Sequence, residues 1–296
     1  MSDHSPCAPV RSKDAAPATG GAMTIGDEEF NLLRRLIKSR FGINLTDQKR
    51  SLVVGRLQKL LRGEGFVNFK QYYEYLVNDK SERGLSELIN RISTNHTYFN
   101  REKAHFDFFQ QTALPAVVEM MRRQNNRDLR IWCAGCSSGE EPYTLQMLMM
   151  EHFGSEYSKW DAGILATDIS ERVLSIARAG IYPQERVAQL PQPLQNKYFR
   201  KLPDGNCQVT EAVRKEIVYR RFNLMNEKFP FKKPFHMVFC RNVMIYFDQQ
   251  TREGLVQRFN QSTVNGGYLF IGHSETLGRN HALYRYVMPA VFQKGA

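Results

Sequence analysis

The chain has 296 residues and 42% of them are hydrophobic, which allows one large domain or two modest ones with a sizeable core. No apolar run reaches the roughly 18–20 residues that a transmembrane helix needs, and the N-terminus lacks the apolar segment of a signal peptide. The net charge of +11 favours an acidic partner, such as nucleic acid, an anionic membrane surface or an acidic protein, or serves solubility alone.

The first part of the chain predicts a disordered tail followed by a small all-helical domain. Residues 1–22 lack periodicity and are rich in turn-forming residues, whereas apolar residues recur at helical spacing from 23 to 92. Gly42 and Gly63 are expected to end the first two helices of this domain.

One flank of the second helix is basic. At 100° per residue, Lys49, Arg56 and Lys59 lie within about 80° of one another around the helix axis. A charged helix face is commonly just solvated, but it also suits docking to an acidic partner. Both interpretations stay open at this point.

Residues 93–103 form a linker between the helical domain and the rest of the chain. The segment is polar but contains two adjacent aromatic residues, so we expect it to pack in part while Asn95, Thr97 and Arg101 stay accessible. Such a linker can lie over the open end of a cofactor site or can simply join two domains.

Residues 104–296 alternate between strand and helix patterns, which predicts a doubly wound α/β sheet. The first strand leads into CAGCSSGEE, where Gly135 and Gly139 allow the backbone to approach a ligand or merely make a tight turn. Asp168 ends the next strand, where an acid can accept hydrogen bonds from both hydroxyls of a ribose or can cap the following helix.

The later part of this domain adds two features. Residues 200–221 look like a short antiparallel insertion with two strands. A buried strand at 236–240 is followed by Asn242 and Tyr246, at the sheet edge where ligands bind in open α/β folds. These two side chains either hold a polar group of a substrate beside the cofactor or form a capped turn and a packed tyrosine.

The sequence predicts no metal site and no phosphate-binding loop. Five scattered cysteines indicate a reducing cytoplasm, and Cys133 and Cys136 lack the second ligand pair that zinc would need, so we interpret them as small residues lining a turn. The histidines are dispersed, and the segment 273–275 is interpreted as loop structure. Since a ribose-binding acid is expected without a phosphate-cradling motif, the favoured cofactor is a nucleoside without phosphates, such as S-adenosylmethionine.

Five stretches in family order make the chain resemble the CheR-type chemotaxis receptor glutamate methyltransferases over about residues 25–294; they are TNHTYFNRE, WCAGCSSGEEPYTL, ATDIS, RNVMIYFD and GHSETL. The resemblance implies an all-helical N-terminal domain, a linker at the cofactor site, and a Rossmann-like S-adenosylmethionine-dependent methyltransferase sheet with a small antiparallel β-subdomain. It also implies a cytoplasmic enzyme, recruited to membrane receptor arrays, that methylates glutamate side chains on the cytoplasmic helical bundle of chemoreceptors and releases S-adenosylhomocysteine.

The resemblance assigns roles to individual residues. Arg101 and Tyr246 match the pair that orients the reacting groups, Glu141 would lie at the amino group of the cofactor, and Asp168 would hold its ribose. The residues expected to contact the cofactor are Asn95, Thr97, Arg101, Glu141, Asp168, Asn223 and Leu224 (both at the adenine), Cys240 and Arg241 (both at the methionine portion) and Asn242. Those expected to dock the receptor bundle are Lys49, Arg50, Arg56 and Lys59.

Two departures from the family pattern matter. Asn100 stands where the family commonly has a second bulky residue, which is expected to loosen the packing of the linker. The insertion between Phe199 and Asn223 looks a few residues shorter than in members that grip a C-terminal pentapeptide tether of the receptor, so we expect no dependence on a tether. We also expect a monomer that neither binds nucleic acid nor inserts into a membrane. The alternatives are a nucleic-acid methyltransferase and a cofactor-binding regulator without catalysis.

Overall fold

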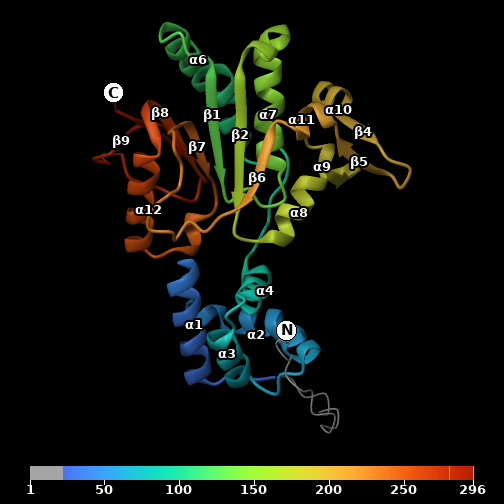
Figure 1. Ribbon diagram of the computed structural model, residues 1–296, viewed down its shortest axis with the longest axis vertical. Coiled ribbons are helices and arrows are strands. Elements are labelled where there is room, and N and C mark those ends of the chain that lie inside the picture. The colour runs from blue at the N-terminus through green and yellow to red at the C-terminus, as the bar shows by residue number, and fades with distance from the viewer. Residues whose placement is uncertain (1–22, 280, 296) are drawn as a thin grey trace, which may run out of the picture.

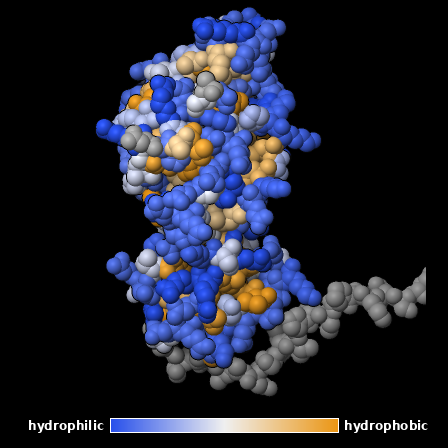
Figure 2. Space-filling model, turned by 90° about the vertical axis from the view of Figure 1, so that its left-hand side faces the viewer, coloured by the Kyte–Doolittle hydropathy of each residue, from blue (hydrophilic) through white to orange (hydrophobic). Residues whose placement is uncertain are grey.

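The computed structural model describes residues 23–279 and 281–295, so the predicted disordered tail at 1–22 lies outside the described residues. A group of helices lies at one end of the molecule and a sheet with flanking helices at the other (Figure 1). On the face drawn in Figure 2, hydrophobic residues lie in separate patches among hydrophilic ones. No helix in the described part of the chain is both long enough and apolar enough to span a bilayer.

Four helices build the N-terminal part around one hydrophobic cluster. They are α1 (Asp27–Phe41), α2 (Arg50–Glu64), α3 (Phe69–Asn78) and α4 (Arg83–Ile92). Gly42 ends α1 in the left-handed conformation, as predicted. The prediction that Gly63 ends α2 is wrong: the helix continues to Glu64, and Gly65 takes the left-handed conformation instead.

Five parallel strands and a C-terminal antiparallel hairpin form the main sheet, in the order β6-β2-β1-β7-β8-β10-β9. This order confirms the predicted Rossmann-like α/β architecture. The strands are β1 (Asp128–Ala134), β2 (Asp161–Asp168), β6 (Ile217–Arg221), β7 (Phe235–Cys240), β8 (Thr263–Ile271), β9 (Tyr284–Met288) and β10 (Val291–Lys294).

Helices cover both faces of this sheet, and successive residues of β1 point into the two resulting cores. Ile131 belongs to the cluster under α5 (Lys103–Phe108), α6 (Leu114–Arg123) and α7 (Glu140–Phe153), whereas Trp132 packs in the cluster under α12 (Gln249–Gln261). A π turn at Phe109–Ala113 separates α5 from α6, where Pro115 has no N–H to donate. The remaining flanking helix, α8 (Glu171–Ala179), packs beside β2 and β6.

A second, three-stranded antiparallel sheet confirms the small β-subdomain but corrects its position in the chain. Its order is β3 (Ile181–Pro183), β5 (Asn206–Val209) and β4 (Phe199–Lys201). The predicted insertion at 200–221 is wrong in its bounds, because the strand near 217–219 is β6 of the main sheet, paired parallel to β2. Three short helices complete this region: α9 (Gln184–Val187), α10 (Gln192–Tyr198) and α11 (Glu211–Arg214).

Candidate functional site

A cavity of about 240 Å³ lies between the helical part and the carboxyl ends of the parallel strands. A single water molecule needs a cavity of only about 10–15 Å³, so this cavity accommodates a much larger ligand. Eleven of the predicted site residues line it: Lys49, Asn95, Thr97, Arg101, Glu141, Asp168, Asn223, Leu224, Arg241, Asn242 and Tyr246. Cys240 does not, because its side chain is completely buried in the cluster under α12. The cavity therefore does not reach this thiol, and the expected contact of Cys240 with the cofactor stays a prediction.

The turn between β1 and α7 forms one wall and requires glycine at two positions. Gly135 and Gly139 have φ of +89° and +96°. A Cβ on Gly135 would lie 2.4 Å from a methyl of Val243, and one on Gly139 would lie 2.8 Å from the Cβ of Ala177. A side chain at either glycine would therefore clash with these neighbouring residues.

The two thiols near this turn are buried, and burial raises the pKa of both Cys133 and Cys136 well above the usual value. A thiol that keeps its proton is a poor nucleophile. This agrees with their interpretation as small residues in a turn.

Asp168 presents a carboxylate to the cavity at the end of β2. Its oxygens accept backbone hydrogen bonds from Ser137 (2.9 Å) and Ser170 (2.9 Å), and it forms no ion pair among the described residues. Burial raises its pKa. The alternative that Asp168 caps the following helix is wrong, since the hydroxyl of Ser170 accepts from the N–H of Val173 and caps α8. A buried carboxylate with free lone pairs and no cation suits neutral hydroxyl donors such as those of a ribose.

The linker lies across the turn after β1 and is tied down there. The hydroxyl of Ser137 donates to the carbonyl of Asn95 at 3.1 Å, and the guanidinium of Arg101 donates to the carbonyl of His96 at 2.6 Å. Asn100 does not prevent the linker from packing here, since Phe99 beside it is fully buried. Asn100 has φ of +61°, a conformation that asparagine tolerates better than a bulky residue does.

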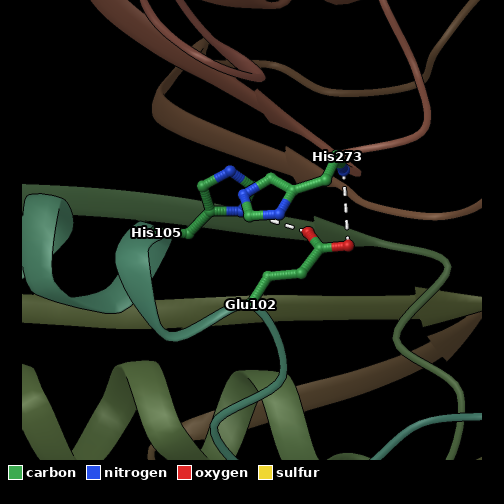
Figure 3. A group of neighbouring side chains, drawn as sticks. All are labelled: Glu102, His105 and His273. Atoms are coloured by element: carbon green, nitrogen blue, oxygen red, sulfur yellow. Dashed lines mark hydrogen bonds and ion pairs between the residues drawn. The ribbon is translucent and has the colours of Figure 1, made fainter.

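Glu102 was not among the predicted site residues, although it lies within the linker motif. Its carboxylate accepts hydrogen bonds from the side chains of Arg241 (3.1 Å) and Asn242 (3.1 Å) and from the N–H of His273 (3.3 Å). Figure 3 shows this carboxylate beside the rings of His105 and His273. Burial alone would raise the pKa of Glu102, but Arg241 and the other donors outweigh it and lower the pKa.

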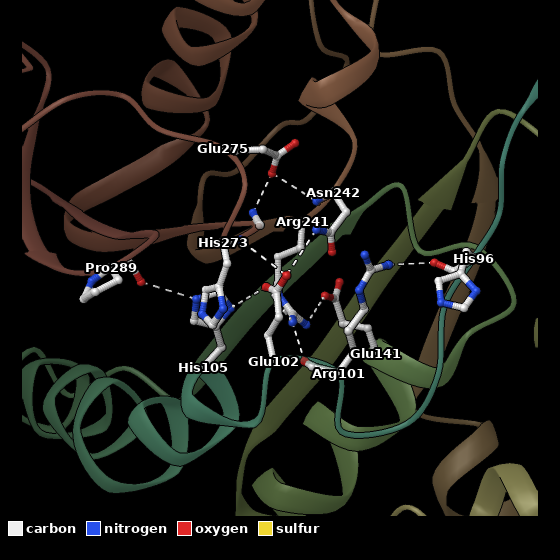
Figure 4. A network of polar contacts seen from close by, with 11 residues as sticks. His96, Arg101, Glu102, His105, Glu141, Arg241, Asn242, His273, Glu275 and Pro289 are labelled. Atoms are coloured by element: carbon white, nitrogen blue, oxygen red, sulfur yellow. Dashed lines mark hydrogen bonds and ion pairs between the residues drawn. The ribbon is translucent and has the colours of Figure 1, made fainter.

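Arg241 is a buried cation between two carboxylates (Figure 4). Its Nη1 donates to Glu141 at 2.9 Å, and its Nη2 donates to Glu102 at 3.1 Å and to the carbonyl of Arg101. Burial raises the pKa of Glu141, and Arg241 opposes that rise. The guanidinium therefore joins the linker, α7 and the segment after β7 at the floor of the cavity.

Glu275 is the second residue that sequence reasoning missed, although it lies in the quoted motif GHSETL. Its buried carboxylate accepts the backbone N–H groups of Gly272 (2.5 Å), Asn242 (3.0 Å) and Ile245 (3.1 Å). Burial raises the pKa of Glu275, and these N–H donors oppose the rise. Because Ile245 directly precedes Tyr246, Glu275 fixes the turn that carries Tyr246 into the cavity.

Tyr246 also contacts the linker and the helical part. Its hydroxyl donates to the carbonyl of Thr94 at 3.3 Å, its own carbonyl accepts the N–H of Asn44 at 2.8 Å, and Ile43 forms a β-bridge with Phe247. The ammonium of Lys49 lies 5.7 Å from the centre of the Tyr246 ring. The helical part is thus attached directly beside this tyrosine.

The four predicted docking residues do not form one free basic surface. Arg56 donates to the carbonyl of Ile92 (2.6 Å) and to the hydroxyl of Thr94 (3.0 Å), and Arg50 pairs with Asp27 (2.5 Å). Lys59 is exposed, and Lys49 lies at the cavity wall. Arg56 therefore fastens the start of the linker.

Comparison with known proteins extends over nearly the whole described chain. Residues 28–93 match the family model "CheR methyltransferase, all-alpha domain", and residues 95–291 match "CheR methyltransferase, SAM binding domain". A chemotaxis protein methyltransferase of Borreliella burgdorferi is 46% identical over 272 residues, which cover 92% of this chain and 96% of that protein. The chemotaxis protein methyltransferase of Escherichia coli is 35% identical over 256 residues, 86% of each chain. The chain therefore belongs to the CheR methyltransferase family.

Proposed function

We propose that this protein transfers a methyl group from S-adenosylmethionine to glutamate side chains in the cytoplasmic helical bundle of chemoreceptors, forming glutamate methyl esters. The observation that carries the proposal is the cavity, which brings the carboxylate of Asp168, without an ion-pair partner among the described residues, together with Arg101 and Tyr246 from two other segments. The names of the curated relatives support chemotaxis as the setting. No comparable observation favours a nucleic-acid methyltransferase or a regulator without catalysis.

The cavity residues suit the parts of this cofactor. Asp168 would accept hydrogen bonds from the ribose hydroxyls, and Glu141 would face the amino group. Asn223 and Leu224 would lie at the adenine, with Asn95, Thr97 and Asn242 completing the wall. Bound S-adenosylmethionine supplies an electrophilic methyl group on a sulfonium, and transfer leaves S-adenosylhomocysteine. No residue of this set needs a metal for these roles.

The substrate needs positioning more than activation. A glutamate carboxylate has an ordinary pKa near 4.3 and is already ionised at neutral pH, so no general base is required. Holding its oxygen in line at about 3–3.5 Å from the methyl carbon, with water excluded, is the main task. Arg101 would orient the negative charge, and Tyr246 would donate a hydrogen bond to the carboxylate.

Both side chains must exchange a partner before they can do so. Arg101 donates to His96 and Tyr246 to Thr94, both in the linker. A substrate carboxylate would replace these two carbonyl acceptors with a charged one, which forms the stronger hydrogen bond. The linker would thus hold the two donors ready in the cofactor-free protein.

The proposal also includes the surface that docks the receptor and the place in the cell where the enzyme acts. Lys49 and Lys59, with smaller contributions from Arg50 and Arg56, would face the acidic methylation region of the receptor. A receptor substrate would place the enzyme in the cytoplasm at membrane receptor arrays, and we propose that it acts there as a monomer. We expect independence from a C-terminal pentapeptide tether, and measurable calorimetric binding of a tether peptide with an aromatic pair would contradict it.

Incubation with labelled S-adenosylmethionine and receptor-containing membranes tests the function. The expected result is alkali-labile label on receptor glutamates, identified by peptide mapping, and a loss of labelling in Tyr246→Phe with retained cofactor binding. Label in nucleic acid, alkali-stable label, or no transfer despite cofactor binding would overturn the proposal.

A further inference from the structure

We propose a zinc-binding site formed by Glu102, His105 and His273, beside the cofactor cavity. The ligand atoms of these three side chains all lie within 4.8 Å of one another (Figure 3). Two imidazoles and one carboxylate are a donor set that zinc uses with a fourth position left to water. None of the three was predicted as a ligand. Glu102 and His105 lie three residues apart at the start of α5, but the third ligand, His273, comes from a segment far away in the sequence.

The surroundings of His105 suit a bound cation. The ring is completely buried, with Nε2 3.4 Å from the carbonyl oxygen of Pro289 and Nδ1 3.4 Å from Oε2 of Glu102. A neutral imidazole has one N–H and one lone pair, so it can satisfy only one of these two oxygens. Nδ1 makes no hydrogen bond, which leaves a buried nitrogen facing a carboxylate oxygen. A cation between them turns two opposed acceptors into two ligands.

The charge around the cluster also favours a cation. Glu102 and Glu141 both contact the single guanidinium of Arg241, so two carboxylates share one positive charge. Zinc would share Oε2 of Glu102 with Arg241, which connects the site to the floor of the cofactor cavity.

His273 can close the site from solvent. Its side chain is exposed, and its ring lies 4.5 Å from that of His105, centre to centre, at 79°. Ligands at about 2 Å from one ion lie at most about 4 Å apart, so the most distant pair must approach by about 1 Å. A rotation of the exposed His273 side chain supplies this movement, while its backbone N–H keeps its contact with Glu102.

Calorimetric titration with zinc chloride tests the site directly and does not depend on methyl transfer. Because His4 and Cys7 can bind zinc on their own, every protein in the comparison carries His4→Ala and Cys7→Ser. The parent should bind one zinc ion per chain, and the added change His273→Ala should weaken binding by at least about 10-fold. His152→Ala removes another exposed histidine, outside the cluster, and should leave binding unchanged.

A second readout separates ligation from an indirect effect. Cobalt(II) in the parent should give the visible absorption bands of a low-coordinate ion with nitrogen ligands, and Glu102→Gln should weaken them. The site is refuted if the parent shows no saturable zinc binding in the micromolar range. Equal binding by the parent and the His273→Ala protein would refute it as well.

Discussion

Replacing Glu275 by glutamine tests whether this buried carboxylate positions Tyr246. Glutamine keeps the size of the side chain but has one acceptor oxygen and one NH₂ group, so it cannot serve all three N–H donors of Gly272, Asn242 and Ile245. The least costly orientation leaves the glutamine oxygen with the N–H groups of Gly272 and Asn242 and turns the NH₂ group toward the N–H of Ile245. A donor then faces a donor immediately before Tyr246.

The structure sets the size of the expected effect. An unsatisfied buried donor costs about 1–3 kcal/mol, and the loss falls on the one-turn helix Met244–Tyr246. If about 1.4 kcal/mol of it opposes the reactive placement of Tyr246, kcat falls about 10-fold. Asp168 and Glu141 lie on other segments, so the Kd for S-adenosylhomocysteine should change less than about 3-fold.

Steady-state methylation of receptor membranes gives kcat, and calorimetry gives the Kd of the product. Glu253→Gln is the matched control, because Glu253 is an exposed glutamate on α12 whose carboxylate contacts only Gln249 among the described residues. A thermal melt shows that the variant folds. An unchanged kcat with a lowered melting temperature would show that Glu275 stabilises the fold without positioning Tyr246. An equal loss of kcat and of cofactor affinity would also refute its positioning role.

Four further changes test other parts of the structure. Asp168→Ala should weaken cofactor binding by at least about 30-fold in an equilibrium titration, since two hydrogen bonds to a charged acceptor are lost. Glu141→Gln should also weaken it while leaving the cofactor-free protein at least as stable in urea, because burial raises the pKa of Glu141 and so disfavours its charge. The pKa of His236 is lowered to about 4 by burial, so stability should fall by up to about 3 kcal/mol between pH 6.5 and 4, and His236→Gln should flatten this dependence in unfolding titrations. Lys59→Glu should raise KM for receptor about 3-fold at low salt and less at high salt, with unchanged cofactor affinity.

Local patterns predicted most of the fold, and the errors came from pairings that depend on distant residues. The strand at 217–219 has a short apolar alternation that fits either an insertion or a sheet edge. Its partner decides: Ile217 and Tyr219 are buried where β6 pairs with β2, while Val218 is 46% exposed at the edge of the sheet. Likewise, Gly63 and Gly65 look equal in sequence, and packing selects the second to end α2.

The site was predicted where chemistry follows from a motif and missed where it follows from geometry. Asp168 and Tyr246 lie in motifs at strand ends, and both line the cavity. Glu102 and Glu275 are in quoted motifs too, but their roles come from donors far away in sequence, Arg241 for one and Asn242 for the other. No spacing within the chain encodes these contacts.

Two of the carboxylates that line the cavity carry a charge that burial makes unfavourable. Burial raises the pKa of Asp168 and of Glu141 above their ordinary values. Between the ordinary pKa of the unfolded chain and the raised pKa of the folded chain, such an acid binds fewer protons when the chain is unfolded. The stability of the fold therefore falls as pH rises through this interval. Above it, at neutral pH, the ionised group destabilises the fold. Hydroxyls at Asp168 and an ammonium at Glu141 would relieve this cost without any change of fold. The same two carboxylates would then connect cofactor binding to stability, because a ligand that binds only the folded chain stabilises it more the more tightly it binds.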